Sequence, residues 1–357
     1  MEKPLANRFS YFSSQTQSVD SSPTWEELLL HHTAELPLSE EKRQPNGDVW
    51  WLDVYDSTQE DVEAIADAFN IHPLTAEDVA MRETREKVEV FRTYYFISFR
   101  TLVSDAQADG YPSSAELYIL VFYNGALTFS PQGCRHVDRV RNRIRKMQDP
   151  AALSSDWICY ALIDDIVDSF EPFMRAAELE AEAIEDQVFI ARVDDAKMLI
   201  PRVDGLRKKI THLVHCLNGK GDVLNGFVKR CKAKDKHPVF PEGDLIMYLG
   251  DVQDHLVTTM SNLSHFDEIV GRSQANCLAH LSAINLRLSL NINSVISKVS
   301  VLAAIFVPMH MVTVLWGMNV PVPGQENHGV AWFFGIFGVL MAFMFVSLFV
   351  SGRMKLL

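Results

Sequence analysis

The sequence predicts an α/β cytosolic domain followed by a long stalk helix and two C-terminal transmembrane helices. Three observations support this fold class. Between residues 48 and 130, short β-branched and aromatic runs alternate with a helical pattern. Strand signals disappear after Ser155. Two uncharged apolar segments, Val299–Trp316 and Val330–Val350, lie close to the C-terminus.

These patterns predict three regions before the membrane: a partly disordered N-terminal tail (1–47), the cytosolic α/β domain (48–155) and a helical hairpin region (156–242). Three further regions follow: the stalk with the first span (243–317), an external loop (318–329), and the second span with a basic C-terminus (330–357). The tail assignment rests on Arg8, Tyr11 and scattered Ser and Gln residues, with no apolar segment that would indicate a signal peptide.

Within the α/β domain, the runs predicted as strands are Val49–Tyr55, Tyr94–Val103, Leu117–Tyr123 and Ala126–Phe129. Asn124-Gly125 predicts a two-residue type I′ hairpin turn between the last two, because both central positions of that turn require positive φ. Ser57 and Glu60 have capping-box spacing and are expected to begin a helix that runs to about Phe69. Pro73 is expected to start the next helix.

From residue 156 to 217 the pattern is helical almost throughout. Its acidic side chains either form a solvated helix face or attract cations; they are Glu178, Glu180, Glu182, Glu185 and Asp186. His212, His215 and Cys216 have a helical spacing compatible with metal ligands, but no fourth ligand is evident, so a core or surface cluster is favoured. Residues 218–242 contain glycines, prolines and a basic patch and predict an exposed connection.

The segment Gly243–Trp316 contains no proline before Pro308, and its apolar residues recur at helical spacing. A single helix over this segment would extend about 110 Å at ~1.5 Å per residue. Such a helix cannot bury its apolar stripe alone. We therefore expect it to pack against copies of itself in a homo-oligomer with a central axis.

The two apolar segments contain 18 and 21 residues without a formal charge. Both lengths suit helices that cross ~30 Å of hydrocarbon. The short connection between them predicts a helical hairpin, and it contains no Lys or Arg. Basic residues lie outside the hairpin at Arg287, Lys298, Arg353 and Lys355, which places both termini in the cytoplasm. The whole chain has a formal net charge of −13, and residues 298–357 carry +2, so the preceding part carries about −15 and would attract cations rather than nucleic acid.

Steps of three and four residues back from Gly317 define one face of the stalk and first span: Asn293, Ile296, Val299, Val307, His310 and Val314. If this face surrounds the axis of an oligomer, its apolar rings would line a pore and could gate it by dewetting. His310 is the one ionisable side chain within either predicted span. It is expected in the pore or between helices, the alternative being a neutral histidine bonded to a neighbouring helix.

The triplet Gly317-Met318-Asn319 follows the first of the two spans. In this position it resembles the signature of the CorA family of magnesium transporters, and the resemblance covers roughly residues 48–357. It includes His72–Asp78, Lys87–Glu89, Asp251–His255 and Pro308. The segments Trp157–Asp164 and Trp316–Gln325 look most like the fungal branch of that family, in the plasma or vacuolar membrane.

The resemblance implies a homopentamer with a funnel-shaped cytosolic domain, a pore-lining stalk helix and a second helix that faces lipid. It implies that Gly317, Met318 and Asn319 select the ion, with a ring of carboxamides that holds Mg²⁺ through its water shell. Mg²⁺ dehydrates reluctantly, which suits such a ring. It also implies that Glu77 and Asp78 bind regulatory Mg²⁺ together with Asp251 of the partner subunit, and thereby close the pore.

The expected function is gated entry of Mg²⁺ into the cytosol. A zinc transporter of the same superfamily is one alternative. His310 and Val314 depart from the family pattern and leave open a two-span sensor or scaffold with a vestigial pore. An enzyme is not expected, because the sequence has no P-loop, GxSxG, HExxH or Rossmann glycine pattern. The five cysteines are scattered without CxxC spacing and predict reduced thiols.

Overall fold

The structure is a computed structural model that describes residues 7–16, 18–32, 48–103, 112–147, 153–190, 193–232, 245–323 and 330–353. The chain forms two compact units, which are treated separately. The first contains residues 1–190 and 199–273, and the second contains residues 191–198 and 274–357.

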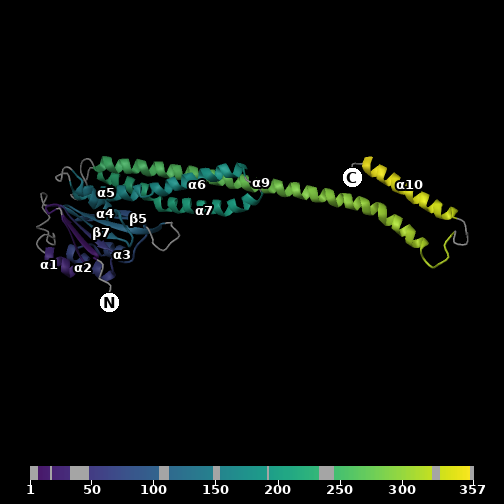
Figure 1. Cartoon of the computed structure of the whole chain (residues 1–357). Coiled ribbons are helices and arrows are strands. Elements are labelled where there is room, and N and C mark those ends of the chain that lie inside the picture. Colours follow the sequence, from purple (N-terminus) through teal and green to yellow (C-terminus); the bar gives the residue numbers. More distant parts are fainter. Residues whose placement is uncertain are drawn as a thin grey trace. The chain divides into compact units, whose positions relative to one another are not determined.

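The first unit is built on a seven-stranded sheet with the order β2-β1-β3-β7-β6-β5-β4 (Figure 1). Its strands are β1 (Phe9–Ser13), β2 (Val19–Ser22), β3 (Trp50–Tyr55), β4 (Lys87–Val90), β5 (Tyr94–Val103), β6 (Ser113–Phe122) and β7 (Gly125–Ser130). Strands β3 and β7 are parallel, and the other neighbouring pairs are antiparallel. The predicted α/β domain is confirmed.

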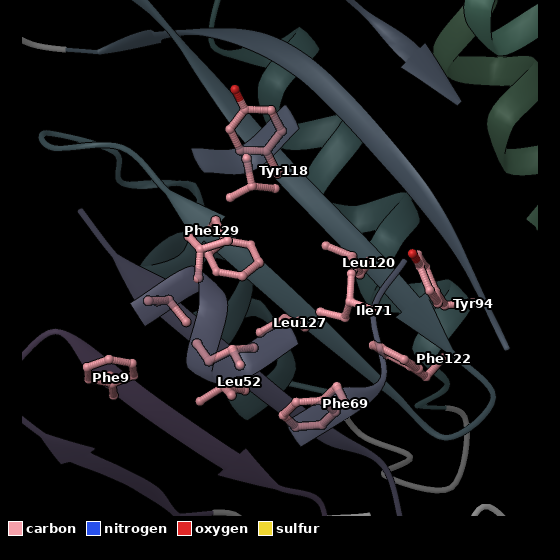
Figure 2. Packing of buried hydrophobic residues seen from close by; sticks show 14 of the residues in the cluster. Phe9, Leu52, Phe69, Ile71, Tyr94, Tyr118, Leu120, Phe122, Leu127 and Phe129 are labelled. Atoms are coloured by element: carbon pink, nitrogen blue, oxygen red, sulfur yellow. The ribbon is translucent and has the colours of Figure 1, made fainter. Parts of the chain in front are cut away.

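Helices cover both faces of this sheet. On one face lie α1 (Trp25–His32), α2 (Gln59–Phe69) and α3 (Pro73–Ala80), and on the other lie α4 (His136–Arg145) and α5 (Ser155–Asp168) (Figure 1). Figure 2 shows Leu52, Leu120 and Leu127 of the strands packed beside Phe69 of α2. Because side chains alternate between two covered faces, the central strands are buried along most of their length rather than at alternate residues.

The prediction of a disordered tail is wrong for the described part of residues 1–47. Strand β1 pairs with both β2 and β3, and Phe9 and Tyr11 are buried in the core. Serines between these aromatic residues concealed a strand whose alternate side chains face the core. The α/β domain therefore begins before residue 48, and residues 1–6 and 33–47 lie outside the described part.

Local signals located the following helices to within a residue. The capping box of α2 uses Thr58 and Asp61 instead of Ser57 and Glu60, since the Asp61 amide donates to the Thr58 hydroxyl and the Thr58 amide to the Asp61 carboxylate. Helix α2 ends at Phe69 as predicted. Pro73 is the first residue of α3, where a missing amide proton has no cost.

The predicted hairpin between β6 and β7 exists, but its turn lies one residue earlier. Phe122 pairs with Gly125, so the two turn residues are Tyr123 and Asn124, and neither has positive φ. The type I′ prediction is therefore wrong. Gly125 is required for a different reason: a Cβ at this position would overlap the buried indole of Trp50.

Gly125→Ala is expected to destabilise the first unit by about 2 kcal/mol or more, because a large buried ring must move. The purified full chain should then unfold roughly 5 °C lower in a thermal melt. Gly205→Ala is the matched control, because a Cβ at Gly205 meets no atom within 4 Å. An unchanged melting temperature for Gly125→Ala would contradict the packing described here.

The remaining helices are α6 (Glu171–Ile190), α7 (Val193–Leu217), α8 (Lys220–Cys231), α9 (Leu245–Trp316) and α10 (Ala331–Arg353). The exposed connection predicted at residues 218–242 is wrong where it is described, because α8 occupies most of it and buries Leu224 and Phe227. Its glycines hid this apolar face. Of the predicted basic patch, Lys229, Arg230 and Lys232 are in or just after α8, and Lys234 and Lys236 lie outside the described part. Helix α9 has 72 residues and confirms the single long helix.

Candidate functional site

The second unit consists mainly of the C-terminal part of α9 and of α10. Both helices are long and apolar enough to cross a membrane. Val312 and Trp316 of α9, together with Trp332 and Gly335 of α10, border one apolar cavity of about 620 Å³. Further back along α9, Ile305 is buried, with 5% of its surface exposed. Val312 and Trp316 therefore mark the side of α9 that faces α10.

The predicted pore residues occupy the opposite side of α9. At about 100° per residue, positions 312 and 316 lie within about 20° of Ile305 around the helix axis. The pore residues lie about 120° to 180° away from Ile305, and all are exposed: Asn293, Ile296, Val299, Val307, His310 and Val314. Helix α10 therefore leaves this face of α9 uncovered.

The Gly317-Met318-Asn319 triplet begins immediately after the end of α9. The Gly317 amide donates to the carbonyl oxygens of Thr313 and Val314, 3.1 Å from each, and so closes the last turn. A Cβ on Gly317 would lie 3.4 Å from the Thr313 oxygen and 3.5 Å from the Val314 oxygen, which is ordinary van der Waals contact. Met318 and Asn319 are exposed beyond the helix end.

A second group of predicted site residues lies on α3 in the first unit. The helix is held by Tyr94 of β5, whose hydroxyl accepts from the His72 amide at 3.0 Å and bonds the Thr75 hydroxyl at 2.9 Å. The His72 side chain also accepts from the Leu74 amide and caps the helix. This anchoring presents Glu77 to solvent and leaves Asp78 half-buried.

Exposed apolar side chains flank two of the three predicted regulatory acids, Asp78 and Asp251. Leu74 and Met81 lie one turn before and one turn after Asp78 on the same face of α3, and they are 58% and 77% exposed. Asp251 of α9 is exposed one turn after Met247, which is 67% exposed. Apolar patches of this kind on a charged surface are typical of protein interfaces.

Asp78 and Asp251 have different neighbouring residues. Asp78 is ion-paired with Lys87 of β4 at 2.6 Å. Asp251 lies near the stacked rings of Tyr160 and Tyr248, whose centroids are 5.2 Å apart. Burial raises the pKa of Tyr160, and the charges of Asp164 and Asp251 add to that effect. In the described residues, no group of three or more His, Cys, Asp or Glu side chains is arranged to hold a metal ion.

The other sequence candidates form internal contacts. His212 Nε2 lies 3.7 Å from Cys216 Sγ, and burial lowers the pKa of His212, with the charge of His215 acting in the same direction. On the acidic helix α6, the Glu180 carboxylate lies 3.4 Å from Arg202 and 3.3 Å from Lys209 of α7. At least this part of the acidic face is therefore paired within the chain.

Sequence reasoning noted Lys87 only as part of a motif and missed its contact with Asp78. Alternation along β4 places Lys87 and Glu89 on the same side of the strand, and this could have indicated a shared partner. It also missed Lys220, whose ammonium is fully buried against Glu86 and lies 5.3 Å from the Phe99 ring centroid. Burial lowers the pKa of Lys220, and the Glu86 charge opposes that shift.

The fold and these surfaces define a class: a membrane protein with two candidate spans and a large α/β domain that shares the longer helix with them. The chain belongs to the family described as CorA-like Mg²⁺ transporter protein, whose sequence profile matches residues 46–351. The predicted family resemblance is confirmed.

Several relatives are fungal. A Schizosaccharomyces pombe protein is 42% identical over 347 residues, which cover 97% of this chain and 42% of the relative. The magnesium transporter ALR2 of Saccharomyces cerevisiae is 36% identical over 98% of this chain and 45% of the relative. The chain thus spans less than half the length of these relatives.

A solved structure of the CorA magnesium transporter from Methanocaldococcus jannaschii has the same fold. Its TM-score is 0.64 at 14% sequence identity, and the match covers 99% of both chains. This similarity establishes the predicted architecture of an α/β domain, a long helix and a second C-terminal helix.

Proposed function

We propose that this chain is one subunit of a homo-oligomer, a pentamer in keeping with the CorA resemblance, that moves hydrated Mg²⁺ across a membrane into the cytosol. The observation that carries this proposal is the position of Gly317-Met318-Asn319 at the end of the α9 face that α10 leaves uncovered. Family membership and relatives named as magnesium transporters support it.

The physical chemistry of the triplet suits a hydrated ion. Mg²⁺ binds its waters tightly, and a carboxamide oxygen can accept hydrogen bonds from those waters without displacing them. A symmetric ring of Asn319 side chains would hold the ion on the axis. Below the ring, an apolar path would be formed by Val314, Val307, Val299 and Ile296. This path would exclude ions that the Asn319 ring binds poorly, and it could close by dewetting.

The flanking charges support entry into the cytosol as the direction of transport. Arg287, Lys298 and Arg353 lie at the ends of the spans away from the triplet, which favours a cytoplasmic location for both termini. With the triplet outside, an inside-negative potential drives entry by ~2.3 kcal/mol per charge per 100 mV. The resemblance to the fungal branch implies a plasma or vacuolar membrane.

The same proposal assigns regulation to Glu77, Asp78 and Asp251. The exposed apolar residues beside Asp78 and beside Asp251 support contact between these two surfaces across a subunit interface. Carboxylate oxygens are suitable Mg²⁺ ligands. Facing carboxylates repel one another unless a divalent cation bridges them, so cytosolic Mg²⁺ would stabilise the closed oligomer and its loss would favour opening.

Purified full-length protein in liposomes provides the test. With a potassium-diffusion potential that is negative inside, an internal Mg²⁺-sensitive dye should report uptake well above that of protein-free liposomes. A parallel series with Zn²⁺ separates the proposed substrate from the zinc alternative. Uptake of Zn²⁺ without uptake of Mg²⁺, or uptake of neither ion, would contradict the proposed function.

A further inference from the structure

The ammonium group of Lys87 lies between two carboxylates at the predicted regulatory surface. Its Nζ is 2.6 Å from Asp78 Oδ2 on α3 and 3.2 Å from Glu89 Oε1 on the same strand. A single positive charge thus bridges two acids from different elements. This is the arrangement that a bound cation would adopt between the same oxygens.

Neighbouring groups hold the Lys87 ammonium in place but leave it partly exposed to solvent. The Lys87 side chain is 21% exposed, and its Nζ lies 5.9 Å from the centroid of the Phe96 ring, within the range of a cation–π contact. Burial opposes the charged form, but hydrogen bonds to Asp78 and Glu89 outweigh it and raise the pKa of Lys87. The group is therefore an ammonium ion at neutral pH.

Space for movement lies directly beside the pair. Asp78, Lys87 and Glu89 line a cavity of about 670 Å³, which is also lined by Asp222 and Arg230 of α8. A long, flexible lysine side chain can rotate into such a space while its ammonium remains hydrated. Asp222 offers an acidic surface there. Departure of Lys87 from Asp78 therefore requires no rearrangement of α3 or β4.

We propose that Lys87 is an internal competitor of Mg²⁺ for Asp78, and that it sets the cytosolic Mg²⁺ concentration at which the regulatory surface is filled. The inference rests on the proposed regulatory role of Asp78 and adds the residue that tunes it. In the absence of Mg²⁺ the ammonium neutralises Asp78, and a bound divalent ion takes over that carboxylate.

Electrostatics determines the direction of the effect. Asp78, Lys87 and Glu89 together carry one negative charge, and removal of the ammonium leaves two. A positive charge within a few ångströms of a divalent cation is repulsive even with the strong screening of a protein surface. Removal of the Lys87 charge should therefore tighten Mg²⁺ binding, whereas removal of a residue that positions Asp78 would weaken it.

Lys87→Gln tests the inference in the full-length protein. Detergent-purified protein is titrated with Mg²⁺ and exposed briefly to chymotrypsin, which does not cleave at lysine, so the substitution changes no cleavage site. The Mg²⁺ concentration that gives half-maximal protection should fall roughly tenfold in Lys87→Gln, as expected for loss of one nearby repulsive charge. Lys87→Arg retains the charge and should stay within about twofold of the unmodified protein.

Asp78→Asn separates this inference from the proposed function. Loss of Mg²⁺-dependent protection in Asp78→Asn, together with a lower half-protecting concentration in Lys87→Gln, supports both. Loss in Asp78→Asn with an unchanged or higher concentration in Lys87→Gln overturns the role of Lys87 alone. Unaltered protection in Asp78→Asn, or no Mg²⁺-dependent protection of the unmodified protein, overturns the regulatory site and the inference with it.

Discussion

Asn319→Ala is expected to reduce Mg²⁺ uptake into liposomes by roughly tenfold or more, because every subunit would lose an acceptor for the water shell of the ion. A water-mediated hydrogen bond contributes about 1 kcal/mol, and the loss is repeated around the ring. Asn319 is exposed beyond the end of α9, so its removal leaves no buried partner unsatisfied. Uptake is measured with the internal dye at a fixed membrane potential.

Asn276→Ala is the matched control for this substitution. Asn276 is also an exposed asparagine of α9, but it lies well before the proposed pore segment. Its uptake should equal that of the unmodified protein. Size-exclusion chromatography checks that both variants assemble normally. Equal uptake by Asn319→Ala and Asn276→Ala would then contradict a role of the triplet in ion selection.

The double variant Asp78→Ala, Asp251→Ala is expected to lose inhibition by internal Mg²⁺. Two carboxylates that face one another across an interface bind a divalent ion and repel one another without it, whereas alanines do neither. The internal Mg²⁺ concentration that halves uptake should rise at least about tenfold, since two of the three proposed carboxylate ligands are absent. Uptake is measured in liposomes loaded with graded Mg²⁺.

A second double variant, Asp67→Ala, Glu268→Ala, controls for the loss of two negative charges. Asp67 of α2 and Glu268 of α9 are exposed acids outside the predicted regulatory group. This variant should retain normal inhibition. Normal inhibition in the Asp78, Asp251 variant as well would show that regulation uses other residues.

Much of the fold was predictable because its strongest signals are local and long. An apolar period sustained over tens of residues has few structural interpretations, and α9 ends at Trp316 as predicted. The sequence patterns did not predict the elements that tertiary packing stabilises. Strand β1 depends on its neighbours β2 and β3, and α8 tolerates Gly221 and Gly226 because its apolar face is buried.

The candidate site was predictable as a set of positions and not as a set of contacts. Helical periodicity grouped Asn293 to Val314 on one face, and the second helix then identifies this face as the side opposite α10. The ion pair of Asp78 with Lys87 joins a helix to a strand, and no spacing rule links them. Contacts between subunits involve residues of two copies of the chain, so neither a sequence pattern nor a single subunit specifies them.

The central claim is that the face of α9 opposite α10 lines the ion path, and cysteine modification tests it most directly. Val314 lies on that face, and Val312 is close by at nearly the same depth, about 160° around the helix and beside α10. A membrane-impermeant, positively charged methanethiosulfonate should block Mg²⁺ uptake by Val314→Cys and leave Val312→Cys and the unmodified protein unaffected. Block of Val312→Cys with no effect on Val314→Cys would contradict the claim.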